Sequence, residues 1–161
     1  MEPRLELQTT VNKTLMKQLA HYTLMKPRIR ISRVILLCIG LFELWLSSPA
    51  SIAVGVIAIL YVLCYPMLIQ WNYWRRNQPK AGSLYAYSFF DDHFTIVNGS
   101  LSQSAQYDDL FEIEETKEVF GLKRDKNGTV ILPKSCFTAG TPDGFRAFIE
   151  EKTGKKIKFI R

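Results

Sequence analysis

The stretch that decides the fold covers residues 34–69 and has the sequence VILLCIGLFELWL, then SSPAS, then IAVGVIAILYVLCYPMLI. Glu43 is its only charged residue. A helix that crosses the hydrocarbon core of a bilayer needs roughly 20 mostly apolar residues. The second apolar block nearly has this length. The first reaches it if the residues from Ile29 join it and the charged end of Arg33 extends to the interface. The stretch therefore predicts a transmembrane helical hairpin that turns at Ser47–Ser51.

Basic residues are concentrated on both sides of this hairpin. Residues 1–80 carry ten basic and three acidic side chains, whereas residues 81–161 carry 11 basic and 12 acidic ones. The turn carries no basic residue, so the positive-inside rule predicts a two-pass protein of the inner (plasma) membrane with both termini in the cytoplasm. The membrane-flanking basic residues are Arg28, Arg30, Arg33, Arg75, Arg76 and Lys80.

Two other interpretations of the apolar blocks fit less well. A cleaved signal peptide would lie nearer the start of the chain and would not lead into a second apolar block. A hairpin buried in a soluble core would not explain the basic flanks or the aromatic run at Trp71, Tyr73 and Trp74. Gly40 and Gly55 predict a close approach between the two helices.

Glu43 is a candidate functional residue, because a carboxylate within a membrane segment often belongs to an ion or proton path. It also lies one helical turn from Ser47, where it can reach the outer interface, and we favour this second interpretation. The three cysteines, Cys38, Cys64 and Cys136, have no CxxC spacing. They are expected to be small apolar residues in a reducing compartment.

Before the hairpin, Leu5 and Leu7 alternate with charged residues and indicate a strand. Apolar residues between Asn12 and Thr23 follow helical spacing. Thr10 or Asn12 is expected to cap this helix and Pro27 to end it. The helix would either pack on the soluble domain, which we favour, or lie on anionic lipid.

After Gly82 the apolar pattern changes to period two. It predicts antiparallel strands, with hairpin turns at Asn98–Gly99 and Asp125–Gly128. A final helix is expected between an N-cap at Thr141 and Gly154. The predicted strands cover residues 84–90, 94–98, 101–107, 110–115, 117–123 and 129–132.

These elements predict an α+β membrane protein. It would combine a two-helix transmembrane hairpin with a small antiparallel β-sheet or barrel, pleckstrin-homology-like in element order and capped by the C-terminal helix. The expected divisions are an N-terminal cytoplasmic strand and amphipathic helix (1–33), the hairpin (34–69), a basic and aromatic linker (70–82) and the β domain (83–161).

Several stretches of the soluble part resemble the YcxB-like family of bacterial membrane proteins. They are YAYSFFDDHFTIVNGS (Tyr85–Ser100), QYDDLFEIEETKEVFGL (Gln106–Leu122), VILPKSCF (Val130–Phe137) and TPDGFRAFIEEKTGKK (Thr141–Lys156). The resemblance implies a pleckstrin-homology-like domain tethered beneath the membrane. The family is usually described as being of unknown function and supplies no catalytic or binding residues to transfer.

The sequence offers little chemistry for an enzyme. Asp91, Asp92 and His93 could suggest a metal or acid–base site, but a metal needs three or four converging ligands and a hairpin turn explains them better. The acidic run between residues 108 and 118 lacks the spacing of an EF-hand and is interpreted as a solvated strand edge. No phosphate-binding glycine motif or nucleophile elbow is present. We predict no enzyme, no metal and no cofactor.

A second basic cluster lies near the C-terminus and is a candidate for contact with lipid headgroups or a partner. The alternative is a solvated helix end. Nucleic-acid binding is not expected, because this half of the chain is near neutral and aromatic residues do not interleave with the basic ones. The cluster consists of Lys152, Lys155, Lys156 and Lys158.

The expected function is that of a non-catalytic, membrane-tethered binding or adaptor protein. It would present its β domain to a protein or lipid partner at the cytoplasmic face, and its partners would be membrane lipid and another protein of the membrane. Homo-oligomers are compatible with the sequence. The alternative is an immunity-type or accessory subunit whose hairpin docks on another membrane protein.

Overall fold

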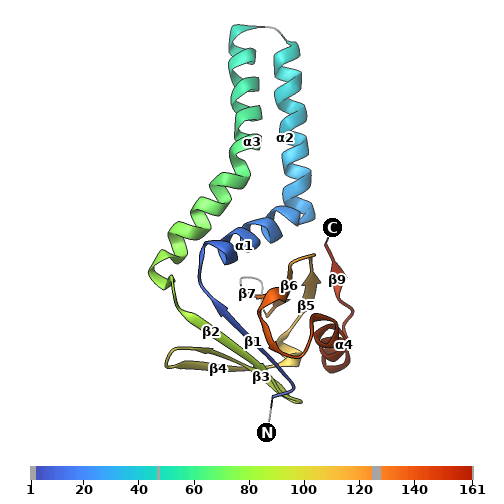
Figure 1. The fold of residues 1–161 in the computed structure, drawn as a ribbon. Coiled ribbons are helices and arrows are strands. Elements are labelled where there is room, and N and C mark those ends of the chain that lie inside the picture. The colour runs from blue at the N-terminus through green and yellow to red at the C-terminus, as the bar shows by residue number, and fades with distance from the viewer. Residues whose placement is uncertain (1–2, 47, 125–127, 161) are drawn as a thin grey trace. The chain divides into compact units, whose positions relative to one another are not determined.

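The computed structural model describes residues 3–46, 48–124 and 128–160, and the chain divides into two compact units (Figure 1). The β unit consists of Met1–Gln18 together with Asn77–Arg161, and the helical unit of Leu19–Arg76. Each unit is described separately below. Residues 125–127 of the second predicted hairpin loop lie outside the described residues.

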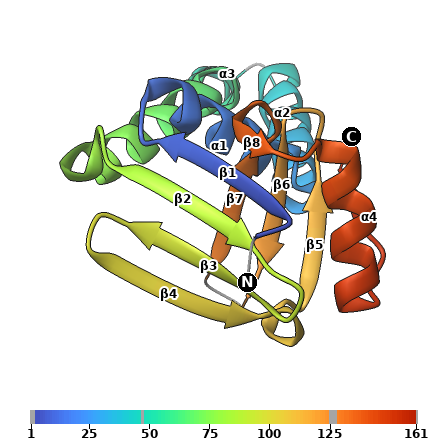
Figure 2. The ribbon, with the colours of Figure 1, turned by 60° about the horizontal axis from the view of Figure 1, so that its bottom comes forward.

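The first sheet of the β unit is antiparallel and has the strand order β4-β3-β2-β1-β8 (Figure 2). Gly99, with a φ of 59°, makes the turn between β3 and β4, as the Asn-Gly pair predicts. The strands are β1 (Leu5–Thr10), β2 (Leu84–Phe89), β3 (His93–Asn98), β4 (Leu101–Gln106) and β8 (Phe137–Ala139).

The second sheet is mixed and has the strand order β7-β6-β5-β9. Its strands are β5 (Glu112–Glu115), β6 (Val119–Lys123), β7 (Thr129–Pro133) and β9 (Lys158–Phe159). β9 pairs parallel with β5, because the chain returns to this sheet after the C-terminal helix. Short 3-10 turns, η2 (Tyr107–Asp109) and η3 (Lys134–Cys136), flank the sheet strands. Because the β unit has two sheets and one of them contains a parallel pair, the prediction of a single antiparallel sheet or barrel is wrong.

The C-terminal helix α4 (Pro142–Thr153) joins the cores of both sheets. Phe145 is fully buried, and its ring centroid lies 5.0 Å from that of Phe89 in β2 and 5.0 Å from that of Phe120 in β6. Thr141 caps the helix, since its Oγ1 accepts a hydrogen bond from the Gly144 amide at 3.0 Å. Both predicted ends of this helix are confirmed, with Gly154 at a φ of 65°.

The N-terminal strand β1 lies between β2 and β8, in the interior of the first sheet. Its pairing with β2 runs from Leu5 opposite Phe89 to Thr10 opposite Leu84. A fragment beginning at residue 83 would therefore lack an interior strand. This pairing joins residues that lie on opposite sides of the long helices in sequence, which is why local sequence patterns gave no sign of it.

Three helices follow β1: α1 (Lys13–Met25), α2 (Pro27–Trp45) and α3 (Pro49–Asn77). Of the two predicted caps of α1, Thr10 and Asn12, it is Asn12 that accepts a hydrogen bond from the Leu15 amide, at 2.8 Å. Pro27 separates α1 from α2 by occupying the first turn of the latter. Residues 70–77, predicted as linker, continue α3, and a 3-10 turn, η1 (Gln78–Lys80), follows.

Within the helical unit, α2 and α3 run antiparallel and side by side (Figure 1). A Cβ on Gly55 would lie 2.6 Å from the Gly40 carbonyl oxygen, and a Cβ on Gly40 would lie 3.2 Å from that of Gly55. Gly55 therefore permits a backbone approach that a larger residue would obstruct, and an added Cβ at Gly40 would be tight against its neighbours. The predicted packing role of Gly40 and Gly55 is confirmed.

The prediction of two transmembrane helices is wrong. Among the described residues, α3 is the only helix long and apolar enough to cross a membrane. α2 has 19 residues but carries Arg28, Arg30 and Arg33 in its first half and Glu43 near its end. The uncharged stretch between Arg33 and Glu43 is much shorter than the roughly 20 residues that a span requires.

Candidate functional site

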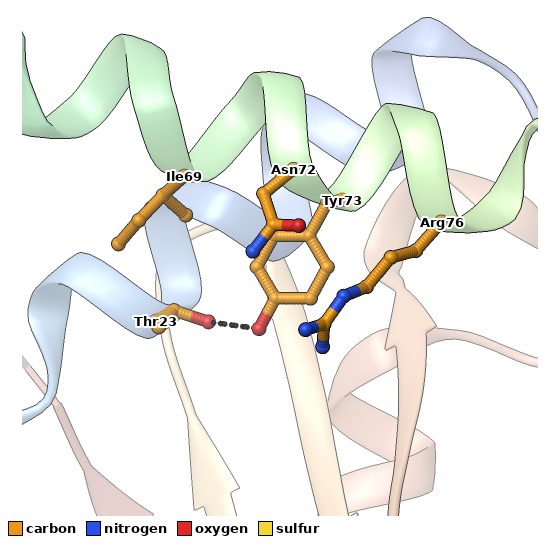
Figure 3. A pocket seen from close by; sticks show the side chains of 5 residues that line it. All are labelled: Thr23, Ile69, Asn72, Tyr73 and Arg76. Carbon is orange, nitrogen blue, oxygen red and sulfur yellow. Dashed lines mark hydrogen bonds between the residues drawn. The ribbon is translucent and has the colours of Figure 1, made fainter.

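A pocket of about 180 Å³ lies in the helical unit, between the end of α1 and the last turns of α3 (Figure 3). Thr23 comes from α1, and Ile69, Asn72, Tyr73 and Arg76 come from α3. The hydroxyls of Thr23 and Tyr73 are hydrogen bonded to each other at 2.9 Å. The pocket thus combines an apolar wall with an amide, two hydroxyls and a guanidinium.

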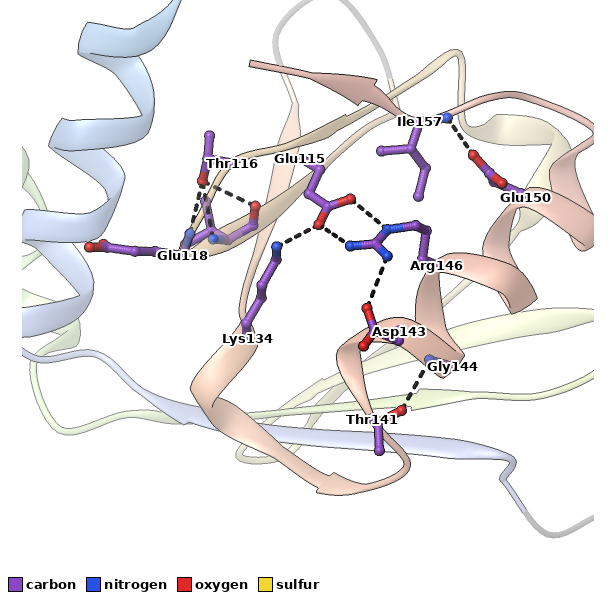
Figure 4. Close-up of polar contacts among 11 residues, drawn as sticks. Glu115, Thr116, Glu118, Lys134, Thr141, Asp143, Gly144, Arg146, Glu150 and Ile157 are labelled. Carbon is purple, nitrogen blue, oxygen red and sulfur yellow. Dashed lines mark hydrogen bonds and ion pairs between the residues drawn. The ribbon is translucent and has the colours of Figure 1, made fainter. Parts of the chain in front are cut away.

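A second cluster surrounds Glu115 in the β unit (Figure 4). The Glu115 side chain has no solvent exposure. The Arg146 side chain donates from Nε to Oε2 at 2.9 Å and from Nη2 to Oε1 at 2.7 Å, and Lys134 donates from Nζ to Oε1 at 2.5 Å. Arg146 also donates from Nη1 to Asp143 Oδ1 at 2.9 Å. The cluster joins β5, η3 and α4 through charged hydrogen bonds.

Burial alone would raise the pKa of the Glu115 carboxyl, because desolvation disfavours its charged form. The hydrogen bonds from Arg146 and Lys134 together outweigh this effect, so the pKa lies below its ordinary value. The same ion pair raises the pKa of the Arg146 guanidinium. Glu115 and Arg146 therefore both stay charged at neutral pH. A carboxylate that already accepts three charged hydrogen bonds connects elements of the fold and is unsuited to accepting a proton from a substrate.

A third charged group lies on the second sheet. Lys123 of β6 donates to Glu112, its cross-strand neighbour in β5, and to Glu114 at 2.7 Å. The hydrogen bond from Lys123 lowers the pKa of Glu112. Lys158 of β9 lies 3.3 Å from the other oxygen of Glu112. These contacts connect three neighbouring strands.

The interpretation of the acidic run as a solvated strand edge is wrong for its central part. Glu114 and Glu115 are 4% and 0% exposed, because β5 lies between β6 and β9. The sequence did contain a signal for one of the pairs, since antiparallel pairing of the predicted strands 110–115 and 117–123 brings Lys123 opposite Glu112. No local signal pointed to Lys134 or Arg146, which meet Glu115 only in the folded chain.

The side chains of Asp91 and His93 contact different partners. Asp91 Oδ1 lies 3.0 Å from Arg4 Nε and 3.1 Å from Lys152 Nζ. His93 Nδ1 lies 2.7 Å from Asp92 Oδ1, and the His93 ring stacks on Phe90. Within residues 3–46, 48–124 and 128–160, no group of three or more His, Cys, Asp or Glu side chains is arranged to hold a metal ion.

Three of the four candidate lysines near the C-terminus contact other residues of the β unit. Lys152 pairs with Asp91, Lys155 donates to the Leu110 carbonyl, and Lys158 pairs with Glu112. Lys156 is exposed and has no side-chain partner among the described residues. Three of the four therefore have internal contacts, which reduces their availability to a headgroup.

The membrane-flanking basic residues lie at helix ends. Arg28 and Arg30 are exposed in the first turns of α2, whereas Arg33 is half-buried. Arg75 and Arg76 are exposed in the last turn of α3, and Lys80 ends η1. Of the six, the structure places Arg76 in the pocket.

Glu43 is half-buried near the end of α2, two residues from Trp45. The pocket residues Thr23 and Asn72 were missed, because an isolated threonine or asparagine in a helix carries no recognisable pattern. Tyr73 was noted only as part of an aromatic run.

One region of the chain matches a known protein family. Residues 89–149 match the family described as YcxB-like protein. The predicted resemblance is confirmed over this region, which extends from the end of β2 into α4 and contains the whole Glu115 cluster. The matched YcxB-like region excludes all three long helices and the pocket. No curated protein and no solved structure matches the chain, so these comparisons give the pleckstrin-homology-like description no support.

Proposed function

We propose that the protein is a non-catalytic membrane-tethered binding or adaptor protein. The α2–α3 pair anchors it, and the β unit binds a protein or lipid partner at the cytoplasmic face. The observation that carries the proposal is the exposure of apolar side chains along α3, where Ile57 is 66% and Leu63 67% exposed. Apolar surfaces of this extent on a helix are typical of contact with lipid or with another protein.

The pairing of β1 with β2 supports an anchor that enters and leaves the membrane on the same face. β1 precedes the helices, β2 follows them, and the two strands are hydrogen-bonded neighbours. α3 alone therefore cannot carry the chain across a membrane, since that would leave β1 and β2 on opposite sides. We infer that α2 and α3 dip into the bilayer and return, to a depth limited by the short uncharged part of α2.

The charge distribution supports the cytoplasmic face. Arg28 and Arg30 begin α2 and Arg75 and Arg76 end α3, so exposed cations lie where the pair would leave the membrane. Basic residues are enriched on the cytoplasmic side. The charged groups of the YcxB-like region form pairs within the fold, which supports a binding role for this region more than a catalytic one.

Flotation of the full chain with liposomes tests the anchor. The protein is expected to float and to resist extraction by high salt, because its attachment is apolar. A chain that stays in the soluble fraction as a stable oligomer would contradict the proposal. If flotation required a second membrane protein, the accessory-subunit alternative would replace it.

Thiol labelling in sealed inner-membrane vesicles tests the dip. Single cysteines at Thr10 and Thr138 are expected to be labelled from the same side, because β1 and β8 share a sheet. A cysteine at Ser48, between α2 and α3, is expected to resist reagents from both sides. Labelling at Ser48 from the opposite side would show that the pair crosses the membrane and would contradict the dip.

A further inference from the structure

The pocket at the end of α3 lies where the residues of the helix change from apolar to polar, aromatic and basic. The apolar run of α3 ends near Ile69, and polar, aromatic and basic residues follow up to Asn77. Trp71, in this region, is 65% exposed. Aromatic and basic residues are enriched at the level of lipid headgroups. If α3 is the membrane anchor proposed above, on which this inference rests, the pocket lies at that level.

Two polar side chains of the pocket, Asn72 and Arg76, can donate hydrogen bonds to a ligand. Asn72 offers its amide and Arg76 its guanidinium, and neither side chain has a hydrogen bond or ion pair with another described residue. Their side chains lie on the same side of α3 as the Tyr73 ring (Figure 3). No carboxylate lines the pocket. It therefore presents positive charge and donors without an internal anion to neutralise them.

This set of groups suits a phosphate. A guanidinium donates two parallel hydrogen bonds to phosphate oxygens, and the amide adds a third donor. The volume of about 180 Å³ is ample for such a group, since a water molecule occupies about 30 Å³ in the liquid. Ile69 forms an apolar wall beside the donors, which free phosphate would not use but the acyl region of a lipid would.

We propose that this pocket binds a phosphate group, supplied by a membrane phospholipid. Arg76 and Asn72 hold the phosphate oxygens, and the hydrogen-bonded Thr23–Tyr73 pair fixes the wall opposite them. Arg75 and Arg76 are both exposed, but Arg76 lines the pocket and Arg75 does not. A diffuse attraction to anionic lipid would use the two arginines equally.

The test measures retention of dioleoylphosphatidylglycerol by the full chain in detergent, using native mass spectrometry, with dioleoylglycerol as the phosphate-free comparison. Arg76→Gln is expected to weaken phospholipid binding about tenfold, as loss of a charged hydrogen-bonding partner does. The matched control Arg75→Gln removes the same charge and is expected to change binding less than twofold. Equal losses in both variants, or no loss in Arg76→Gln, would overturn the proposal.

Two further arms identify the source of the phosphate and check the anchor. Inorganic phosphate is expected to compete only weakly. If it binds as tightly as phosphatidylglycerol with the same dependence on Arg76, the lipid source is wrong. Liposome flotation of Arg76→Gln is expected to match that of the original chain. Normal flotation with unchanged lipid retention would overturn the pocket alone, whereas failure of the original chain to float would overturn the anchor.

Discussion

In the β unit most of the large apolar side chains are buried, whereas along α2 and α3 most of them are exposed. Phe89, Phe120 and Phe145 have no solvent exposure, but Ile57 and Leu63 of α3 are about two-thirds exposed. Removal of apolar surface from water is the main driving force of folding. The comparison indicates that the β unit completes its core by itself, while the helical pair leaves much of its apolar surface exposed.

The contact between the helices reinforces this difference. The buried residues of α2 and α3 are Gly40, Gly55 and Val62, so small side chains dominate their contact. Helix pairs in lipid pack through small residues, because lipid is as apolar as a leucine side chain and offers no hydrophobic gain for large ones. The β unit instead interlocks aromatic rings from two sheets and a helix.

The largest expected effect is on the stability of the β unit. Arg146→Met removes two of the hydrogen bonds that neutralise the buried Glu115 and is expected to lower the free energy of unfolding by about 3 kcal/mol. Hydrogen exchange of the β5 and α4 amides measures it. Arg4→Met breaks an exposed pair with Asp91 and should cost much less, because solvent screens this pair. Equal costs would show that burial of Glu115 has no special weight.

The second prediction compares a leucine-to-lysine substitution in the helical unit with one in the β unit. Leu63→Lys in α3 and Leu101→Lys in β4 replace leucines that are 67% and 69% exposed. A lysine in the apolar part of a membrane helix is unfavourable, so Leu63→Lys should reduce liposome flotation and Leu101→Lys should leave it unchanged. If both variants floated like the original chain, the exposed face of α3 would not be a lipid contact.

The third prediction concerns the helix contact. Gly55→Ala forces a Cβ against the Gly40 carbonyl oxygen and is expected to destabilise the helical unit by about 1–2 kcal/mol. Tryptophan fluorescence reports this unit, since all three tryptophans lie in α2 and α3. The matched control is Gly144→Ala in α4, where a Cβ would meet only the Thr141 hydroxyl at 3.2 Å. It should be neutral or slightly stabilising.

The smallest effect concerns pH. Because the pKa of Glu112 is lowered in the folded chain, its carboxylate stabilises the fold above the ordinary carboxyl pKa. That stabilisation is lost as the pH falls through the folded-state pKa. Glu112→Gln should therefore lower stability at pH 7 by less than about 1 kcal/mol and leave stability at strongly acidic pH unchanged. Urea unfolding at the two pH values measures it.

Glu118→Gln is the control for this last comparison. Glu118 is exposed, and its side chain has no ion pair among the described residues. No change in stability is expected at either pH. A loss for Glu118→Gln as large as that for Glu112→Gln would show that net charge, not the contact with Lys123, controls the acid response.

Features that depend on neighbouring residues were predictable. The Asn98–Gly99 turn, the caps at Asn12 and Thr141 and the glycine end of α4 all follow from local backbone preferences. The two small residues in the helix contact also followed from their positions in apolar helices. The prediction failed for α2 because hydropathy was extended past Arg33, although the arginines before it leave too short an uncharged stretch.

The sequence by itself determined where strands, turns and helices form, because these depend on interactions over a few residues. Only the tertiary structure decided that β1 pairs with β2 and β8, that β9 joins β5 in parallel, and that Glu115 meets Lys134 and Arg146. It also brought Thr23 beside Arg76 in one pocket. These partners are far apart along the chain, and the choice among many candidate partners depends on how the whole core packs.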